Sequence, residues 1–153
     1  KLRKNDYVKK NKQFIFLPDV GKAINYLNSK NFCVIIISNQ ACVGKGIISE
    51  KILNNIHKYM KNKLVKNHNA NIDDIYYSPY YKFSKNNKYK ENKKNRKPNI
   101  GMFLKAEKKW NINMNKSFFI GDSITDYKAS KKLKLKFYYK REGSLYNQIK
   151  KII

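Results

Sequence analysis

The sequence is poor in acidic residues: ten aspartates and glutamates stand against 35 lysines and arginines, which gives a formal net charge of +25 over 153 residues. Cysteine is also scarce, and two cysteines are too few for a disulfide framework. We expect Cys33 to be a buried thiol within an apolar run and Cys42 to lie in a loop. No run of 18 apolar residues occurs, which excludes a typical membrane-spanning helix.

The basic surplus is almost entirely lysine, since the sequence contains only three arginines. Two explanations remain open at this point. A genome rich in A and T substitutes lysine and asparagine wherever packing allows, which gives a basic surface without a function. Alternatively, the lysines form a surface for an anionic partner such as nucleic acid, which binds clustered cations through counterion release.

Hydrophobic residues make up 41% of the chain, enough for a packed core, and the length fits one domain over residues 1–153. Short apolar runs predict strands at 32–38, 73–78, 116–122 and 134–140. Helical spacing of apolar residues predicts helices at 20–31, 49–64 (with Ser49 as N-cap), 101–112, 123–133 and 144–153. This alternation indicates an α/β fold with a parallel sheet, interrupted by an exposed Lys-rich loop at 79–97.

Two polar clusters follow predicted strands. Ser38, Asn39 and Gln40 end the first run, and the segment "GDSITD" follows "FFI" at residues 121–126. Ligands of parallel sheets bind beyond the carboxyl ends of the strands, so we expect these clusters to share one site.

Three segments, "CVIIISNQ", "RKPNIGMFLKA" and "SFFIGDSITD", resemble in their order the haloacid-dehalogenase (HAD) superfamily of phosphatases. From Asp6 to Tyr139 the connecting text is similar to its heptose-1,7-bisphosphate and histidinol-phosphate phosphatases. Any one motif is weak, because GDxxxD is common, but the ordered set with its spacing is specific. The resemblance implies a Rossmannoid three-layer fold around a parallel sheet.

The resemblance also implies catalytic roles. Asp122 would ligate Mg²⁺, Asp126 would order the surroundings of the metal, and Lys97 would supply the cation that stabilises transferring phosphate. The Ser38 hydroxyl would donate a hydrogen bond to a phosphate oxygen. Each of these residues also has a non-catalytic alternative. Asp122 would cap a helix, and Asp126 would place a negative charge at a helix N-terminus. Ser38 would simply end a strand, and Lys97 would be one more surface lysine.

Further residues would bind the substrate according to the same resemblance. The backbone amides of Asn39, Gln40 and Ala41 would contact phosphate oxygens. Arg96 would recognise a phosphate or hydroxyl groups with its planar fork, and Ser123 occupies another position where the family contacts substrate.

The sequence departs from the family in one catalytic segment. The family's nucleophile lies in a DxDG segment at the end of a first strand, just before the stretch that matches "LRKNDYV". Asp6 does not replace it, because Asp6 follows no apolar strand. We therefore expect the chain as given to lack the first strand and to be inactive. We interpret it as a truncated sequence rather than a natural pseudoenzyme.

A second departure concerns zinc. Many relatives hold a structural zinc through three cysteines and one histidine in the loop between "IYY" and "RKP", which here is the Lys-rich loop. The matching positions in this sequence are Ser78, Tyr80, Lys93 and Asn95. None of these side chains is a thiolate or an imidazole, so no zinc is expected. Since the loop helps to choose the substrate in this family, the change leaves the substrate sugar open.

The leading hypothesis is a cytoplasmic, monomeric, Mg²⁺-dependent phosphomonoesterase acting on a phosphorylated sugar. Heptose 1,7-bisphosphate, in nucleotide-heptose synthesis for surface glycans, is the expected substrate. The alternatives are a histidinol-phosphate phosphatase, a nucleic-acid 3′-phosphate phosphatase and a non-catalytic basic binding module. No separate nucleic-acid-binding motif is visible, which argues against the nucleic acid.

Overall fold

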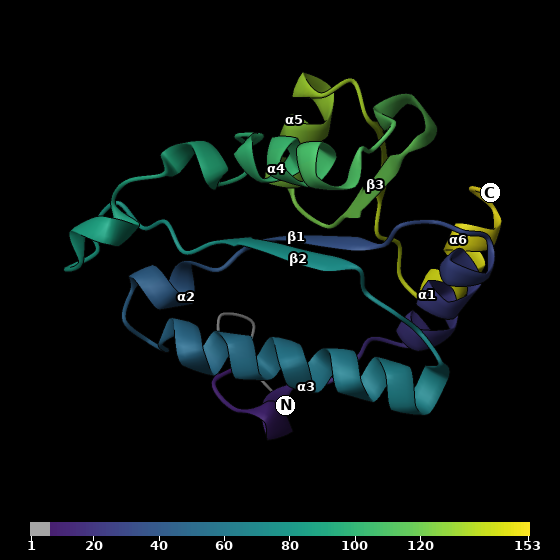
Figure 1. The fold of residues 1–153 in the computed structure, drawn as a ribbon, viewed down its shortest axis with the longest axis horizontal. Helices are drawn as coiled ribbons and strands as arrows, with labels where there is room; N and C mark the ends of the chain where they lie inside the picture. The colour runs from purple at the N-terminus through teal and green to yellow at the C-terminus, as the bar shows by residue number, and fades with distance from the viewer. Residues whose placement is uncertain (1–6) are drawn as a thin grey trace.

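The computed structural model describes residues 7–153 (Figure 1). Asp6 lies outside the described residues, so the expectation that it does not replace the nucleophile stays a prediction. The longer elements are α1 (Val20–Ser29), β1 (Ile35–Asn39), α2 (Ala41–Gly44), α3 (Glu50–His68), β2 (Asp74–Ser78), α4 (Gly101–Trp110), β3 (Phe118–Gly121), α5 (Ile124–Lys132), β4 (Lys136–Tyr139) and α6 (Leu145–Lys150). Short 3₁₀ turns lie at Asn11–Gln13, Asn87–Tyr89, Lys93–Asn95 and Met114–Lys116. Every predicted strand and helix is present, most with shorter bounds than expected.

The strands pair in parallel, which confirms the α/β prediction. β1 pairs with β2, with Ile37 opposite Tyr76, and β3 pairs with β4, with Phe119 opposite Phe137. Among residues 7–153 these pairs form two separate two-stranded sheets rather than one continuous sheet. β1 and β3 therefore each keep one edge without a strand partner in the described part of the chain.

Helices cover both faces of the β1–β2 pair: α3 lies on one face and α4 on the other, while α5 packs against β3 and β4 (Figure 1). Helix α3 buries Leu53, Ile56, Met60 and Leu64, whose spacing of three or four residues places them on one stripe. Ser49 caps this helix as predicted, because its hydroxyl accepts a hydrogen bond from the amide of Ile52 at 3.2 Å. α1 and α6 pack together, through a core that includes Ala23, Leu27 and Ile149.

The prediction of a buried Cys33 is wrong. Its side chain is exposed, because β1 begins only at Ile35 and Cys33 lies in the segment that leads to the amino end of the sheet. The prediction of a loop at Cys42 is also wrong, because Cys42 lies buried within the short helix α2. None of the helices in the described part of the chain has both the length and the apolar character needed to cross a bilayer.

Candidate active site

A cavity of about 530 Å³ separates β1 from β3. Its walls are mainly apolar and come from both strands, for example Ile36 and Ile120. Its polar lining residues are Ser38, Lys97, Asp122, Asp126, Ser117 and Lys140, and the first four of these are predicted site residues. Segments far apart in the sequence thus meet at the carboxyl ends of the strands, as the pattern of polar strand ends predicted.

Lys97 is the buried cation of this site, with 8% of its surface exposed. Its ammonium group donates a hydrogen bond to the carbonyl oxygen of Ile37 at 2.7 Å and lies 2.6 Å from Oδ1 of Asp126. The backbone of Lys97 is held by Asn39, whose side-chain amide accepts from the Lys97 N–H at 3.0 Å and donates to the Lys97 carbonyl at 3.1 Å. Lys97 is therefore not one more surface lysine, and Asn39 has a positioning role that the sequence did not reveal.

Asp126 is buried in the first turn of α5. Its Oδ2 accepts hydrogen bonds from the backbone amides of Asp122 and Ser123, each at 3.2 Å, while the Ser123 hydroxyl accepts from the Asp126 amide at 3.2 Å. This reciprocal pair is a capping box with aspartate in the third position. Burial by itself raises the pKa of Asp126, but the Lys97 ammonium and the Ser123 hydrogen bonds outweigh burial and lower it. Asp126 is therefore an ionised anchor.

Gly121 permits this arrangement. A Cβ atom at residue 121 would lie 2.6 Å from both Cβ and Oδ2 of Asp126, which is closer than non-bonded atoms approach. Because residue 121 has no side chain, the Asp126 carboxylate can fold back onto the end of β3.

Asp122 is exposed, unlike Asp126. Its backbone amide is fixed by Asp126, while its carboxylate is accessible at the end of β3. Mg²⁺ prefers hard oxygen ligands and usually binds one or two carboxylates together with water and substrate phosphate. No group of three His, Cys, Asp or Glu side chains suited to a metal occurs within residues 7–153. The accessible Asp122 carboxylate suits Mg²⁺ as one of its oxygen ligands. The described side chains do not form a complete set of ligands around it.

Ser38 has a hydroxyl group prepared to donate. Its Oγ accepts a hydrogen bond from Nε2 of Gln40 at 2.9 Å, which leaves the hydroxyl proton available for a second partner. The Gln40 backbone amide donates to the carbonyl of Ser78 at 2.8 Å. The expected hydrogen bond from the Gln40 amide to phosphate is therefore not supported, because that donor continues the ladder between β1 and β2. Ala41 begins α2 directly beyond this point.

The cavity lining lacks five of the predicted substrate residues, namely Asn39, Gln40, Ala41, Arg96 and Ser123. Arg96 is half-buried, and its Nη1 donates to the carbonyl of Tyr80 at 3.3 Å. The hydroxyl of Ser123 caps α5 and lies 2.8 Å from the hydroxyl of Thr125. Arg96 keeps further donors free, whereas the Ser123 hydroxyl is engaged within the helix turn.

The Lys-rich loop is fixed mainly by one carboxylate. Glu50, at the start of α3, accepts hydrogen bonds at 2.9 Å from the Lys88 ammonium and from the Tyr89 hydroxyl. The Tyr81 amide donates to the Tyr89 carbonyl at 2.9 Å, which closes the loop on itself. Phe83 is 67% exposed and contributes little to this anchoring.

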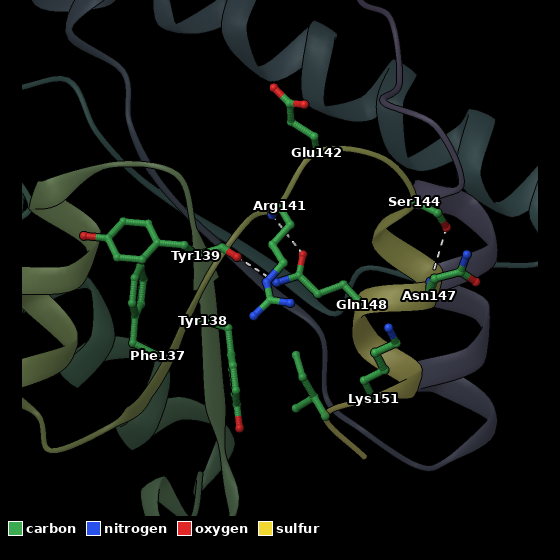
Figure 2. A pocket seen from close by; sticks show the side chains of 10 residues that line it. Phe137, Tyr138, Tyr139, Arg141, Glu142, Ser144, Asn147, Gln148 and Lys151 are labelled. Carbon is green, nitrogen blue, oxygen red and sulfur yellow. Dashed lines mark hydrogen bonds between the residues drawn. The ribbon is translucent and has the colours of Figure 1, made fainter.

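A second hollow, of about 550 Å³, lies between the end of β4 and α6. Figure 2 shows its lining, in which the Arg141 amide donates to Oε1 of Gln148 at 3.1 Å and Gln148 donates to the Tyr139 carbonyl at 2.7 Å. None of the predicted site residues lines this hollow. Its size alone gives it no catalytic role, so the cavity between β1 and β3 is the candidate active site.

Comparisons with known proteins show the family of the chain. Residues 1–140 match the model of the polynucleotide kinase 3 phosphatase family. The chain is 34% identical over 125 residues to a D-glycero-beta-D-manno-heptose-1,7-bisphosphate 7-phosphatase of Rhodopseudomonas palustris, covering 82% of this chain and 69% of the relative. It is 29% identical over 151 residues to the D-glycero-alpha-D-manno-heptose-1,7-bisphosphate 7-phosphatase of Campylobacter jejuni, covering 95% and 82% respectively.

Solved structures show the same fold. The crystal structure of the D,D-heptose 1,7-bisphosphate phosphatase from B. bronchiseptica, complexed with magnesium and phosphate, superposes with a TM-score of 0.78 at 20% identity. The match covers 99% of this chain and 80% of that one. A HAD-like phosphatase from Mesorhizobium loti superposes with a TM-score of 0.79 at 21% identity, covering 86% of this chain and 62% of that one.

Sequence identity, the family match and the shared fold agree. The chain therefore belongs to the polynucleotide kinase 3 phosphatase family of HAD-like phosphatases, and its relatives include D-glycero-D-manno-heptose-1,7-bisphosphate 7-phosphatases.

Proposed function

We propose that the protein is a Mg²⁺-dependent phosphomonoesterase that removes a phosphate from D-glycero-D-manno-heptose 1,7-bisphosphate. One observation carries the proposal: a buried lysine ammonium, a serine hydroxyl with a free proton and an accessible aspartate meet at the carboxyl ends of β1 and β3. Phosphoryl transfer depends mainly on neutralising and orienting the transferring group, which this set of residues can do.

Each residue has a distinct part in the proposal. The Lys97 ammonium and the Ser38 hydroxyl bind oxygens of the transferring phosphate. Asp122 holds Mg²⁺, which when bound neutralises charge on the phosphate. Asp126 keeps Lys97 oriented and fixes the backbone of Asp122 from its buried position.

The attacking carboxylate is proposed to come from an additional strand between β1 and β3. The cavity there is lined by apolar side chains of both strands, and each strand presents a free edge to it within the described residues. Parallel strands pair about 4.8 Å apart, and one strand hydrogen-bonded to both free edges would join the two pairs into a single sheet. Its carboxyl end would reach Ser38 and Lys97, and residues 1–153 alone are expected to be inactive.

A nucleic-acid 3′-phosphate is the second candidate substrate. The Lys-rich loop at 79–97 leads directly into Lys97, and the description of the matching family names a polynucleotide 3-phosphatase. The heptose bisphosphate remains the first candidate because the curated relatives named above act on it by their printed names. For either substrate we place the enzyme in the cytoplasm as a monomer without zinc.

The test is phosphate release from heptose 1,7-bisphosphate by the full-length protein, with and without Mg²⁺. We expect Mg²⁺-dependent release that falls about 10²–10³-fold in Asp122→Ala. Glu142→Ala removes an exposed carboxylate outside the cavity and serves as the matched control. Release only from a 3′-phosphorylated oligonucleotide would select the second candidate, and a folded protein that hydrolyses neither compound would refute both.

A further inference from the structure

Glu50, at the start of α3, receives hydrogen bonds from three side chains. Its Oε1 accepts from the Lys88 ammonium and from the Tyr89 hydroxyl, each at 2.9 Å, and its Oε2 accepts from the Tyr77 hydroxyl at 3.4 Å. The first two residues belong to the Lys-rich loop, whereas Tyr77 lies on β2, opposite Ser38 of β1. One carboxylate thus joins α3, the loop and the sheet that carries the candidate active site.

The charge of the loop makes this carboxylate important. Residues 79–97 contain seven lysines and one arginine against a single glutamate, Glu91. Like charges at this density repel one another and oppose a compact loop. Among residues 7–153 the ion pair of Glu50 with Lys88 is the one that reaches residues 79–96. The hydrogen bond from Lys88 lowers the pKa of Glu50 although burial raises it, so the carboxylate is ionised at neutral pH.

The loop lacks side chains for the structural zinc that the family resemblance implies. Residues 79–97 contain neither cysteine nor histidine. At one of the positions that match zinc ligands, the Lys93 carbonyl accepts a hydrogen bond from the Arg96 amide at 3.0 Å, which forms a tight turn before Lys97. The described residues therefore do not fit zinc, and hydrogen bonds together with the ion pair of Glu50 hold the loop.

The contacts of Glu50 continue through the loop backbone to Arg96. The Tyr81 amide donates to the Tyr89 carbonyl at 2.9 Å, which joins the two halves of the loop. The neighbouring Tyr80 carbonyl accepts a hydrogen bond from Nη1 of Arg96 at 3.3 Å. The position of the Arg96 guanidinium therefore depends on the part of the loop that Tyr89 holds.

The beginning of the loop has a separate support on α2. Lys45 directly follows that helix, and its ammonium lies 5.4 Å from the ring centroids of Tyr7 and Tyr81. α2 therefore supports the beginning of the loop, whereas Glu50 supports its middle. Both supports act on Tyr81.

We infer that Glu50 is a positioning residue: by holding the Lys-rich loop against α3, it keeps the Arg96 guanidinium in place beside the candidate active site. The inference rests on the proposed function, for which Arg96 is a predicted substrate residue, and it adds a residue that controls substrate affinity from outside the cavity. Glu50 does not line the cavity, so its removal should leave the chemical step unchanged. Sequence reasoning missed this role because a glutamate in the first turn of a helix already stabilises the helix there.

Hydrogen exchange with mass spectrometry on the full-length protein tests these contacts without turnover. In Glu50→Ala the amides of Tyr81, Tyr89 and Arg96 should exchange about tenfold faster than in wild type, because the charge-assisted hydrogen bonds that hold the loop are lost. Glu91→Ala is the matched control, since it removes an exposed carboxylate of the loop itself. Tyr89→Phe removes one hydrogen bond but keeps the ring against the core, so the same amides should show a smaller increase.

Steady-state kinetics on the full-length protein tests the link to Arg96. We expect Glu50→Ala to raise KM for heptose 1,7-bisphosphate about five- to tenfold and to leave kcat within about twofold of wild type. In an Arg96→Met background the same substitution should have no further effect on KM, because Glu50 acts through Arg96. Glu50→Gln, whose amide oxygen can still accept from Tyr89, should recover part of the affinity.

The outcomes separate this inference from the proposed function. Unchanged exchange in Glu50→Ala, or an equal increase in Glu91→Ala, would overturn the positioning role. A fall in kcat alone, or an equal rise of KM with and without Arg96, would overturn it too. If the full-length protein hydrolyses no phosphate ester, the proposed function fails, and the exchange of the Arg96 amide alone then decides whether Glu50 positions this residue.

Discussion

The ammonium of Lys97 lies 2.6 Å from Oδ1 of Asp126, and the two side chains are only 9% and 5% exposed. The lysine charge compensates for the burial of this Asp126 oxygen. The same lysine donates to the carbonyl of Ile37 on β1. One ammonium thus joins β1, the loop before α4 and the first turn of α5.

Replacing Lys97 by methionine is expected to lower the free energy of unfolding by about 3–5 kcal/mol, because it leaves a buried carboxylate without its cation. Urea unfolding followed by circular dichroism measures the change. Lys85→Met, an exposed lysine of the same loop, is the control and should stay within about 0.5 kcal/mol of wild type. A loss below about 1 kcal/mol in Lys97→Met would contradict the view that this ion pair is a structural centre.

Gly121→Ala is expected to destabilise the protein by about 1–3 kcal/mol, since the new methyl group would displace the Asp126 carboxylate from the end of β3. Gly46→Ala provides the comparison. Gly46 has a φ of +72° but no heavy atom within 4 Å of an added Cβ, so its substitution reports backbone strain alone. In the double variant Gly121→Ala/Asp126→Gly, which removes the Asp126 atoms that the methyl group would meet, the two losses should not add, and full additivity in urea unfolding would refute the steric link.

The pH dependence of stability is expected to include a contribution from Asp74, at the start of β2. Burial raises its pKa, but hydrogen bonds from Lys109 at 2.8 Å and from the Trp110 indole at 3.0 Å outweigh burial and lower the pKa well below its usual range. Below pH about 4 the unfolded chain binds a proton at this carboxyl group while the folded chain does not. The stabilisation is therefore present above that pH and is lost as the pH falls.

Urea unfolding between pH 2.5 and 6 checks the sign of this effect. Asp74→Asn should lower stability near pH 6 and flatten its decline in acid, because the substituted side chain cannot bind the proton. Glu142→Gln, at an exposed position, should leave the profile unchanged. A decline in Asp74→Asn as steep as in wild type would assign the acid sensitivity to other carboxylates.

The free edges of β1 and β3 lead to a prediction about amide exchange. In a form of the protein that supplies the proposed strand, backbone amides of β1 and β3 should exchange more slowly than in residues 1–153, because that strand would pair with both edges. β2 and β4 lie outside the cavity and serve as internal controls. Hydrogen exchange with mass spectrometry measures this difference. Equal exchange of β1 and β3 in the two chains would argue against an inserted strand.

Much of the fold was predictable because its signals are local. The apolar run at 32–38 includes all of β1 except its last residue, and Ser49 caps α3 as expected, since both depend on residues adjacent in sequence. The burial of Cys33 was mispredicted because the run is longer than the strand, and only the sheet register shows where pairing begins.

The site was predictable in part. Its motif order indicated that Ser38, Lys97, Asp122 and Asp126 would meet, and all four line one cavity. The division of the two aspartates into one buried anchor and one exposed carboxylate was visible only in the structure, because burial is set by the packing of α5 on β3.

The sequence by itself determined the α/β class, the order of the elements and the set of polar residues at the strand ends, because periodicity and spacing are properties of the chain alone. Only the tertiary structure decided that Asn39 holds the backbone of Lys97, that the Gln40 amide is used in the sheet and that Lys45 lies between two rings. Each of these facts depends on contacts between segments distant in sequence, which no local pattern records.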